Sequence, residues 1–187
     1  YQCSRVCPTE IPIYQKAVEG LRQKIRSEGI KRPFSLRDSI FSNVHLIAKW
    51  GSRFSSISNW MTSNIFIKFL LEKFLRIDRR RQLPKYCIES FDSWFKKRNK
   101  LQDEGPEVVL FHDTFMTYIE PEIGKATTEI LELIGYKVKL VENRRCCGRP
   151  MLSAGKISQA KINAKINVEI LAHYAKRKIP IIVVEPS

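Results

Sequence analysis

The stretch E-V-V-L-F-H-D-T-F-M-T-Y-I-E-P at residues 107–121 decides the fold of the second half of the chain. Its apolar run at residues 108–111 is continuous and has the length of a buried β-strand. A helical pattern follows, and its apolar face carries Ile123, Ala126, Ile130 and Ile134. We therefore expect a β-α unit to begin here.

The residues after this unit repeat the alternation of strand and helix. Residues 137–141 alternate as K-V-K-L-V and predict a second strand, residues 157–177 predict a long helix, and residues 181–184 predict a last strand. The order β-α-β-loop-α-β favours a small parallel sheet with its functional loops at the carboxyl ends of the strands. The long helix is expected to press onto the sheet with Ile157, Ala160, Ala164, Val168, Leu171 and Ala175.

The first half of the chain predicts helices and no strands. Helical spacing covers residues 37–50 and residues 57–77. Phe66, Leu70 and Phe74 give the second of these helices a broad apolar face. The fold class is therefore α/β, with a helical N-terminal half followed by the small parallel sheet.

The chain is strongly basic. It has 33 Lys and Arg against 19 Asp and Glu, a formal net charge of +14, and residues 1–105 hold most of the excess. Such a charge attracts nucleic acid, an anionic membrane face or an acidic partner. Basic clusters at residues 79–81 and 96–100 flank the apolar helical region, so we expect this half to dock onto a membrane or a flavoprotein. The alternative is a helix that packs on the α/β unit with its arginines in water.

Five cysteines without a secretory signal favour reduced thiols over a disulfide framework. Cys3, Cys7 and Pro8 match the end of the iron–sulfur run C-x2-C-x2-C-x3-C-P, of which the first two cysteines are missing. Cys146 and Cys147 stand in R-R-C-C-G-R-P-M-L-S-A-G, where adjacent thiols can face one metal centre and the glycine permits positive φ. Ordinary thiols at a terminus and a buried inert pair are the alternatives.

The remaining titratable residues have plainer interpretations. His45 and His173 fall on expected helices and are interpreted as solvent-facing or packing residues. Cys87 is interpreted as a small packing residue. His112, at the end of the first strand, is expected to face the site and is a candidate proton carrier.

Several motifs together resemble one family. They are C-x3-C-P, I-D-R-R-R-x-L-P at residues 77–84, V-V-L-F-H-D-T-F-M-T-Y-I-E-P, R-C-C-G-R-P-M-L-S-A-G and I-P-I-I-V-V-E-P-S. Over essentially its whole length the chain resembles the iron–sulfur oxidoreductases with a cysteine-rich CCG domain. These include the iron–sulfur subunits of anaerobic glycerol-3-phosphate dehydrogenase and of glycolate oxidase, and the C-terminal part of FAD-linked D-lactate dehydrogenase-like proteins.

The resemblance implies a division into three parts. Residues 1–27 correspond to the tail end of a ferredoxin-like iron–sulfur module and the helix after it. Residues 28–105 are a basic helical connecting region. Residues 106–187 are a CCG-type cysteine-rich α/β domain that is incomplete at its C-terminus.

The resemblance also implies cofactor-binding residues, although no catalytic residue. Cys3 and Cys7 correspond to ligands of a [4Fe–4S] cluster, and Cys146 and Cys147 to the paired cysteines of one CCG unit. Thr114 stands where the family has an earlier cysteine, and a later cysteine would follow the last residue. A hydroxyl does not replace a thiolate as a ligand of iron, so the sequence leaves open whether this unit binds its own cluster.

The function that the resemblance implies is electron transfer within an iron–sulfur oxidoreductase. A flavin-containing dehydrogenase, with FAD on a partner domain or subunit, would oxidise a 2-hydroxy acid or glycerol 3-phosphate and pass electrons through this segment to quinone or another carrier. We expect a component, inactive alone, that is cytoplasmic or peripheral on the inner face of the membrane, and no nucleic-acid partner. The alternative is a basic nucleic-acid- or membrane-binding module with a Cys metal site and no redox role.

Overall fold

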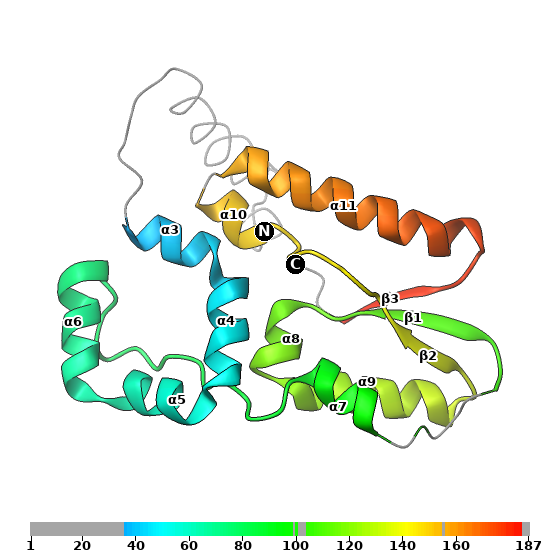
Figure 1. Ribbon diagram of the computed structural model, residues 1–187, viewed down its shortest axis with the longest axis horizontal. Helices are drawn as coiled ribbons and strands as arrows, with labels where there is room; N and C mark the ends of the chain where they lie inside the picture. The colour runs from blue at the N-terminus through cyan, green and yellow to red at the C-terminus, as the bar shows by residue number, and fades with distance from the viewer. Residues whose placement is uncertain (1–35, 99, 101–103, 155, 185–187) are drawn as a thin grey trace, which may run out of the picture.

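Three strands form one parallel sheet, as the sequence predicts. The computed structural model describes residues 36–98, 100, 104–154 and 156–184. The central strand β1 (Glu107–Phe111) lies between β2 (Lys137–Leu140) and β3 (Ile181–Val183), and both neighbours run parallel to it. The predicted order β-α-β-loop-α-β is confirmed (Figure 1).

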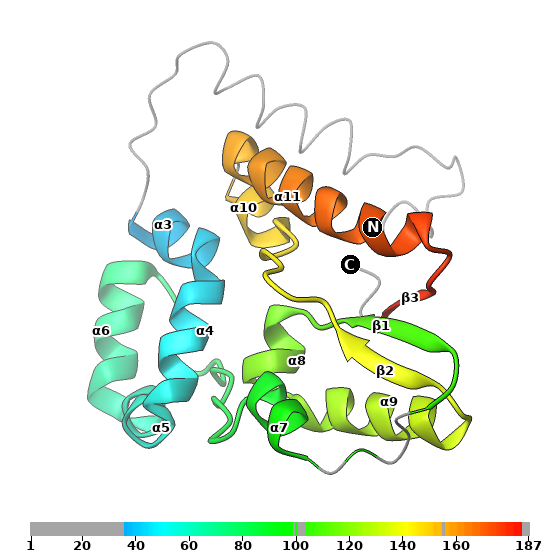
Figure 2. The same cartoon turned by 45° about the vertical axis from the view of Figure 1, so that its right-hand side comes forward.

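Helices lie on both sides of this sheet. The helices α8 (Thr114–Tyr118) and α9 (Pro121–Leu133) follow β1, and α10 (Arg149–Ser153) and α11 (Ile157–Lys176) follow the loop after β2. Both cartoon views show α9 and α7 (Phe91–Lys97) on one side of the sheet and α11 on the other (Figures 1 and 2).

The core forms where α7 meets α9 and the sheet. Phe91 is fully buried in a cluster with Val108, Leu110, Met116 and Val138. A Cβ atom added to Gly124 of α9 would lie 2.7 Å from the Phe91 ring. The glycine therefore sets how closely α7 approaches α9.

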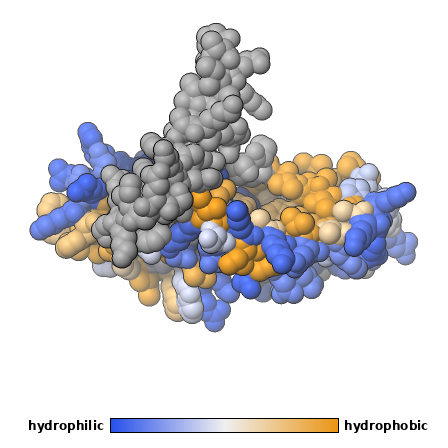
Figure 3. Space-filling view, turned by 90° about the horizontal axis from the view of Figure 1, so that it is seen from above, coloured by the Kyte–Doolittle hydropathy of each residue, from blue (hydrophilic) through white to orange (hydrophobic). Residues whose placement is uncertain are grey.

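The faces that α9 and α11 bury differ from the predicted ones. On α9 the buried residues are Pro121, Gly124, Thr128 and Glu132, whereas Ile123, Ile130 and Ile134 are exposed. On α11 the predicted Ala160 is buried, together with Asn163 and Asn167, whereas Ala164 and Ala175 are exposed and Val168 is 64% exposed. A view onto α11 from above accordingly shows apolar side chains at the surface (Figure 3). Phe91 of α7 packs on α9 at Gly124, and Asn163 and Asn167 of α11 bind the backbone of residues 145 and 146, so these contacts decide which faces are buried.

The helical half consists of shorter helices than the sequence suggests. They are α3 (Leu36–Ser42), α4 (Val44–Arg53), α5 (Ser55–Ser63) and α6 (Ile65–Leu75). The expected helix over residues 57–77 is therefore wrong, because it is divided at Asn64. The Asn64 side chain accepts hydrogen bonds from the backbone N–H groups of Phe66 at 2.9 Å and Ile67 at 3.4 Å, which starts a new helix.

The segment between α6 and α7 joins the helical half to the sheet unit. Asn59 of α5 donates to the carbonyl oxygen of Tyr86 at 2.9 Å and accepts from its N–H at 2.8 Å. One residue further on, the N–H of Cys87 donates to the carbonyl oxygen of Tyr118 at 2.9 Å. Within the described residues, no helix has the length and apolar character that crossing a membrane requires.

Candidate functional site

Two loops meet at the carboxyl edge of the sheet. Thr114 starts α8 shortly after β1, and the cysteine loop, residues 141–148, follows β2. Arg144 bridges the two loops, because its Nη2 donates to the carbonyl oxygen of Asp113 at 3.0 Å and to Oγ1 of Thr117 at 2.8 Å. Thr114 and Cys146 line one cavity, as the parallel sheet led us to expect.

Two asparagines of α11 hold the cysteine loop in place. Asn167 accepts the backbone N–H of Arg145 at 2.8 Å and donates to the carbonyl oxygen of the same residue at 3.1 Å. Asn163 donates to the carbonyl oxygen of Cys146 at 3.4 Å. The side-chain amides therefore form hydrogen bonds with backbone groups of the cysteine loop, which is not part of a β-strand. Neither asparagine was predicted from the sequence, although their spacing of four places them on the same helix face as Ala160, which was a usable signal.

Gly148 sets the turn that follows the cysteines. Its φ of 88° lies in the left-handed region, and α10 begins at the next residue. A Cβ atom at this position would lie 3.4 Å from the Cβ of Ala160 in α11. The Cys-Cys-Gly sequence therefore requires its glycine for the backbone conformation, as the sequence indicated, whereas a Cβ atom would only make an ordinary contact with Ala160.

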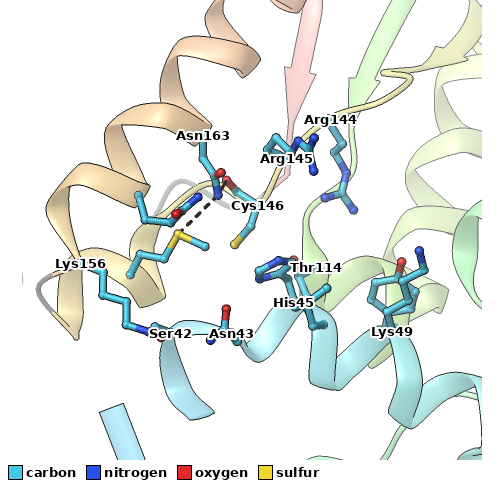
Figure 4. Close-up of a pocket in the computed structure, with 14 residues that line it drawn as sticks. Ser42, Asn43, His45, Lys49, Thr114, Arg144, Arg145, Cys146, Lys156 and Asn163 are labelled. Carbon is cyan, nitrogen blue, oxygen red and sulfur yellow. Dashed lines mark hydrogen bonds between the residues drawn. The ribbon is translucent and has the colours of Figure 1, made fainter. Parts of the chain in front are cut away.

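A cavity of about 530 Å³ separates the cysteine loop from the helical half. The helix α4 forms one wall, and the cysteine loop, Thr114 and the start of α11 form the others (Figure 4). The sulfur of Cys146 points into this space. Basic side chains come from several walls, namely His45, Lys49, Arg144, Arg145 and Lys156.

The two adjacent thiols have different environments. Cys146 is buried and Cys147 is exposed. A hydrogen bond from the Cys147 thiol, helped by the Gly148 N–H and by nearby His45 and Thr114, lowers the pKa of Cys146 to about 5 despite burial. The same hydrogen bond raises the pKa of Cys147. The lowered pKa favours the thiolate form of Cys146, the form that binds soft metals.

The described residues provide part of an iron–sulfur ligand set. Among them, no group of three or more His, Cys, Asp or Glu side chains is placed to hold a metal ion. Cys146 and Cys147 supply two thiols, and Thr114 supplies a hydroxyl next to them. A cluster held by four thiolates is not completed by these residues. Cys3 and Cys7 lie outside the described residues.

Two histidines differ from their interpretations. His112 is not among the residues that line the cavity; it is buried, with its ring centroid 6.1 Å from that of Phe91. Burial and then the charge of Arg144 lower the pKa of His112 to about 4, so its ring is neutral at pH 7. His45, interpreted as a surface or packing residue, instead lines the cavity. The docking of α4 beside α8 places it there.

The other two candidates agree with their interpretations from the sequence. Cys87 packs between α4 and α8, with its Sγ 3.4 Å from Oγ of Ser52 and 3.7 Å from the carbonyl oxygen of Thr117. His173 lies on α11 near the surface, and its ring contacts that of Tyr174 at 5.7 Å. Neither residue lines the cavity.

Residues 109–187 match the family described as CCG, cysteine-rich domain. Over 150 residues the chain is 33% identical to one of the subunits of anaerobic glycerol-3-phosphate dehydrogenase from Escherichia coli (strain K12), an alignment that covers 79% of this chain and 38% of the relative. An uncharacterized iron–sulfur protein of Methanococcus maripaludis is 24% identical over 173 residues, covering 90% of this chain and 27% of that protein.

A third relative matches a shorter part of the chain. Lactate utilization protein A of Bacillus cytotoxicus is 35% identical over 63 residues, which cover 34% of this chain and 26% of the relative. In all three comparisons the chain spans less than two fifths of the relative's length. No solved structure matches the chain significantly.

Proposed function

Because residues 109–187 form a cysteine-rich CCG domain in a chain similar to iron–sulfur proteins, we propose that it is the electron-transfer segment of an iron–sulfur oxidoreductase. The observation that carries this proposal is the pair of Cys146 and Cys147. One of the two thiols is buried with a lowered pKa, at the sheet edge where parallel α/β folds place their ligands.

We assign Cys146 and Cys147 as ligands of an iron–sulfur centre, and Cys3 and Cys7 as ligands of a separate [4Fe–4S] cluster. When bound, such a centre supplies one-electron oxidation and reduction. The chain itself contributes the geometry, since Asn163 holds the carbonyl oxygen of Cys146 in place. The ligands that complete the set come from residues other than the described ones.

The names of the relatives indicate which kind of protein this chain would exchange electrons with. One relative is by its name part of an anaerobic glycerol-3-phosphate dehydrogenase, and another is named for lactate utilization. This supports a dehydrogenase partner that carries FAD and oxidises glycerol 3-phosphate or a 2-hydroxy acid. Quinone or another carrier then receives the electrons.

The test of the redox role compares iron content and visible absorbance in the full-length protein. Replacing Cys146 and Cys147 by Ser should lower the iron content and the absorbance at about 400 nm that iron–sulfur centres give. Cys87→Ser is the matched control, because Cys87 lies away from the cavity and should leave both unchanged. Unaltered iron and absorbance after the double substitution would show that the pair is not a ligand pair. Zinc in place of iron in the parent protein would favour the binding-module alternative.

The helical half supports a further part of the proposal, attachment to the anionic inner face of a membrane. Large side chains are exposed on α4, α5 and α6 and at the residue between α4 and α5, including Trp50, Phe54, Trp60, Phe66, Phe69 and Phe74. These helices contain four Lys or Arg residues and a single acidic residue, Glu72. Exposed aromatic rings beside basic residues are typical of helices that lie in a lipid interface.

Charge reversal tests this attachment. Each basic residue near an anionic leaflet contributes about 1 kcal/mol, so changing the three arginines at residues 79–81 to Glu should release the full-length protein from vesicles that contain phosphatidylglycerol. The control changes the exposed basic residues 176–178 at the end of α11 to Glu, the same alteration of net charge. If both variants sediment with vesicles as the parent does, the arginines at residues 79–81 do not attach the protein to lipid and are a solvated face.

A further inference from the structure

The two edges of the sheet differ in their chemistry. The strand order leaves β2 at one edge and β3 at the other (Figure 1). Two of the four residues of β2 are lysines, and charged side chains commonly keep an edge strand from pairing with another chain. Residues 179–184, which include β3, read I-P-I-I-V-V and carry no charge. The edge at β3 therefore lacks the protection that β2 has.

The backbone of β3 has hydrogen-bonding groups on its outer side. The N–H of Val109 in β1 donates to the carbonyl oxygen of Pro180 at 2.9 Å. Successive strand residues direct their backbone groups to opposite sides, so Pro180 and Ile182 face β1, whereas Ile181 and Val183 face away from it. Pro180 thus removes no donor from the outer side. Among the described residues β1 is the only strand that pairs with β3, which leaves the outer side open to a further strand.

A small groove lies beside the carboxyl end of β3. Its volume is about 50 Å³, far below the roughly 300–1,000 Å³ of pockets that bind small molecules, so it suits a single side chain. Six of its lining residues are apolar, among them Phe115, Ile123 and Val184, which are exposed. The other two, Asp113 and Glu120, are acidic.

The surface around this groove is acidic in a basic protein. Residues 113–134, which include α8 and α9, contain five acidic residues and one basic residue, whereas the chain has a formal net charge of +14. Glu132 is buried against Arg98, but Glu120 and Glu129 are exposed. Such a surface repels an anionic membrane and attracts a segment that carries Lys or Arg.

We propose that the β3 edge binds an extended segment of a partner protein, which adds a strand to the sheet and places an apolar side chain in the groove and a Lys or Arg beside Glu120. In this mode of recognition, main-chain hydrogen bonds to Ile181 and Val183 provide affinity, and the groove provides specificity. The same edge of a second copy fits less well, because residues 179–184 contain no Lys or Arg for the acidic lining. The site goes beyond the redox role and does not depend on it.

The probe is a fluorescein-labelled peptide of sequence T-V-K-V-K-V-T, titrated with the full-length protein and followed by fluorescence anisotropy. Two N-methylated forms block the backbone donors along one edge of the peptide or along the other. The form methylated on the edge that pairs with β3 should bind about tenfold more weakly, because it loses main-chain hydrogen bonds. The other form should bind as the parent peptide does. A peptide with Glu in place of Lys should also bind about tenfold more weakly beside the acidic groove.

Two substitutions test the protein side. Val183→Lys gives β3 the kind of charge that β2 carries, and it should weaken peptide binding about tenfold; its control is Val168→Lys, at an exposed position of α11. Glu120→Gln should weaken binding about threefold; its control is Glu129→Gln, at an exposed position of α9 outside the groove. Both controls should change binding less than about twofold.

Hydrogen exchange followed by mass spectrometry locates the bound peptide. In the parent protein the peptide should slow exchange in the segment that holds Ile181 and Val183, because their outer N–H groups become paired. Exchange in β2, at the opposite edge, should not change.

The proposal is overturned if the peptide does not bind, if both N-methylated forms bind equally well, or if Val183→Lys and Val168→Lys behave alike. A dimer seen by analytical ultracentrifugation without peptide, and abolished by Val183→Lys, would also overturn it, because a second copy would then occupy the edge. Iron content and visible absorbance should stay at the parent level in every variant, since Cys146 and Cys147 are retained. A failure at this edge is therefore distinguishable from a failure of the iron–sulfur proposal.

Discussion

Asn167 holds the cysteine loop by two hydrogen bonds to the backbone of Arg145, and we call this pair of bonds the clamp. Because both bonds depend on one side chain, a single substitution tests the clamp. Asn167→Ala removes the acceptor for the N–H of Arg145 and the donor to its carbonyl oxygen, which lie at 2.8 Å and 3.1 Å from the amide. Each bond contributes about 0.5–1.5 kcal/mol, and leaving the backbone groups unpaired raises the cost. We expect the free energy of unfolding to fall by about 2–3 kcal/mol.

The substitution should also release the loop that carries the thiols. If about 2 kcal/mol of anchoring is lost from the loop, its open state becomes about 30-fold more populated. Alkylation of buried Cys146 by iodoacetamide, followed by mass spectrometry of its peptide, should accelerate by a similar factor. Urea denaturation followed by circular dichroism measures the global loss.

A matched substitution on the same helix provides the control. Gln159→Ala removes an exposed amide of α11 that has no hydrogen bond to the described residues, and it should change stability by less than about 0.5 kcal/mol. The role of Asn167 as a clamp is refuted if Asn167→Ala is no more destabilising than Gln159→Ala and leaves the alkylation rate unchanged. A loss of stability without faster alkylation would show that Asn167 supports α11 and not the loop.

Three further predictions concern stability, each measured by urea denaturation. Gly148→Ala should cost about 1–2 kcal/mol, because an L-residue is strained at a φ of 88°. Glu132→Ala should cost about 3–5 kcal/mol, since it leaves the Arg98 guanidinium, only 5% exposed, without its carboxylate partner. Burial lowers the pKa of His112 to about 4, so the unfolded chain binds a proton between pH 6.5 and pH 4 that the folded chain does not. Stability should therefore fall by up to about 3 kcal/mol as pH drops through that window, and His112→Gln should flatten the dependence.

The sheet was predictable because its strands carry local signals. Residues 108–111 form an apolar run bounded by turn residues, and β2 alternates as expected. Parallel connections then leave few possible topologies. Helix faces were not predictable in this way, because the packing of α9 is set by Phe91, which comes from α7 and is distant in sequence.

The candidate site was predictable in part for the same reason. Cys146 and Thr114 follow neighbouring parallel strands, so the topology alone brings their loops to one edge. His45 and Lys49 carry no such signal, since their place depends on the docking of α4 against α8. Hydrophobic periodicity locates a helix but does not say where it docks.

The helix α4 connects the cavity to the exposed apolar surface, and its packing makes the connection rigid. Ala48 and Gly51 are buried on one side, where a Cβ at Gly51 would lie 2.7 Å from the Tyr86 ring. Lys49 lies at the cavity, and Trp50 is exposed and stacks with Phe54 at 6.3 Å. Successive helix residues point about 100° apart, so these three roles fall on three faces of one helix. A partner bound on the aromatic face is therefore held at a fixed position relative to the thiol of Cys146, and a fixed position is the geometric condition for passing electrons between the two.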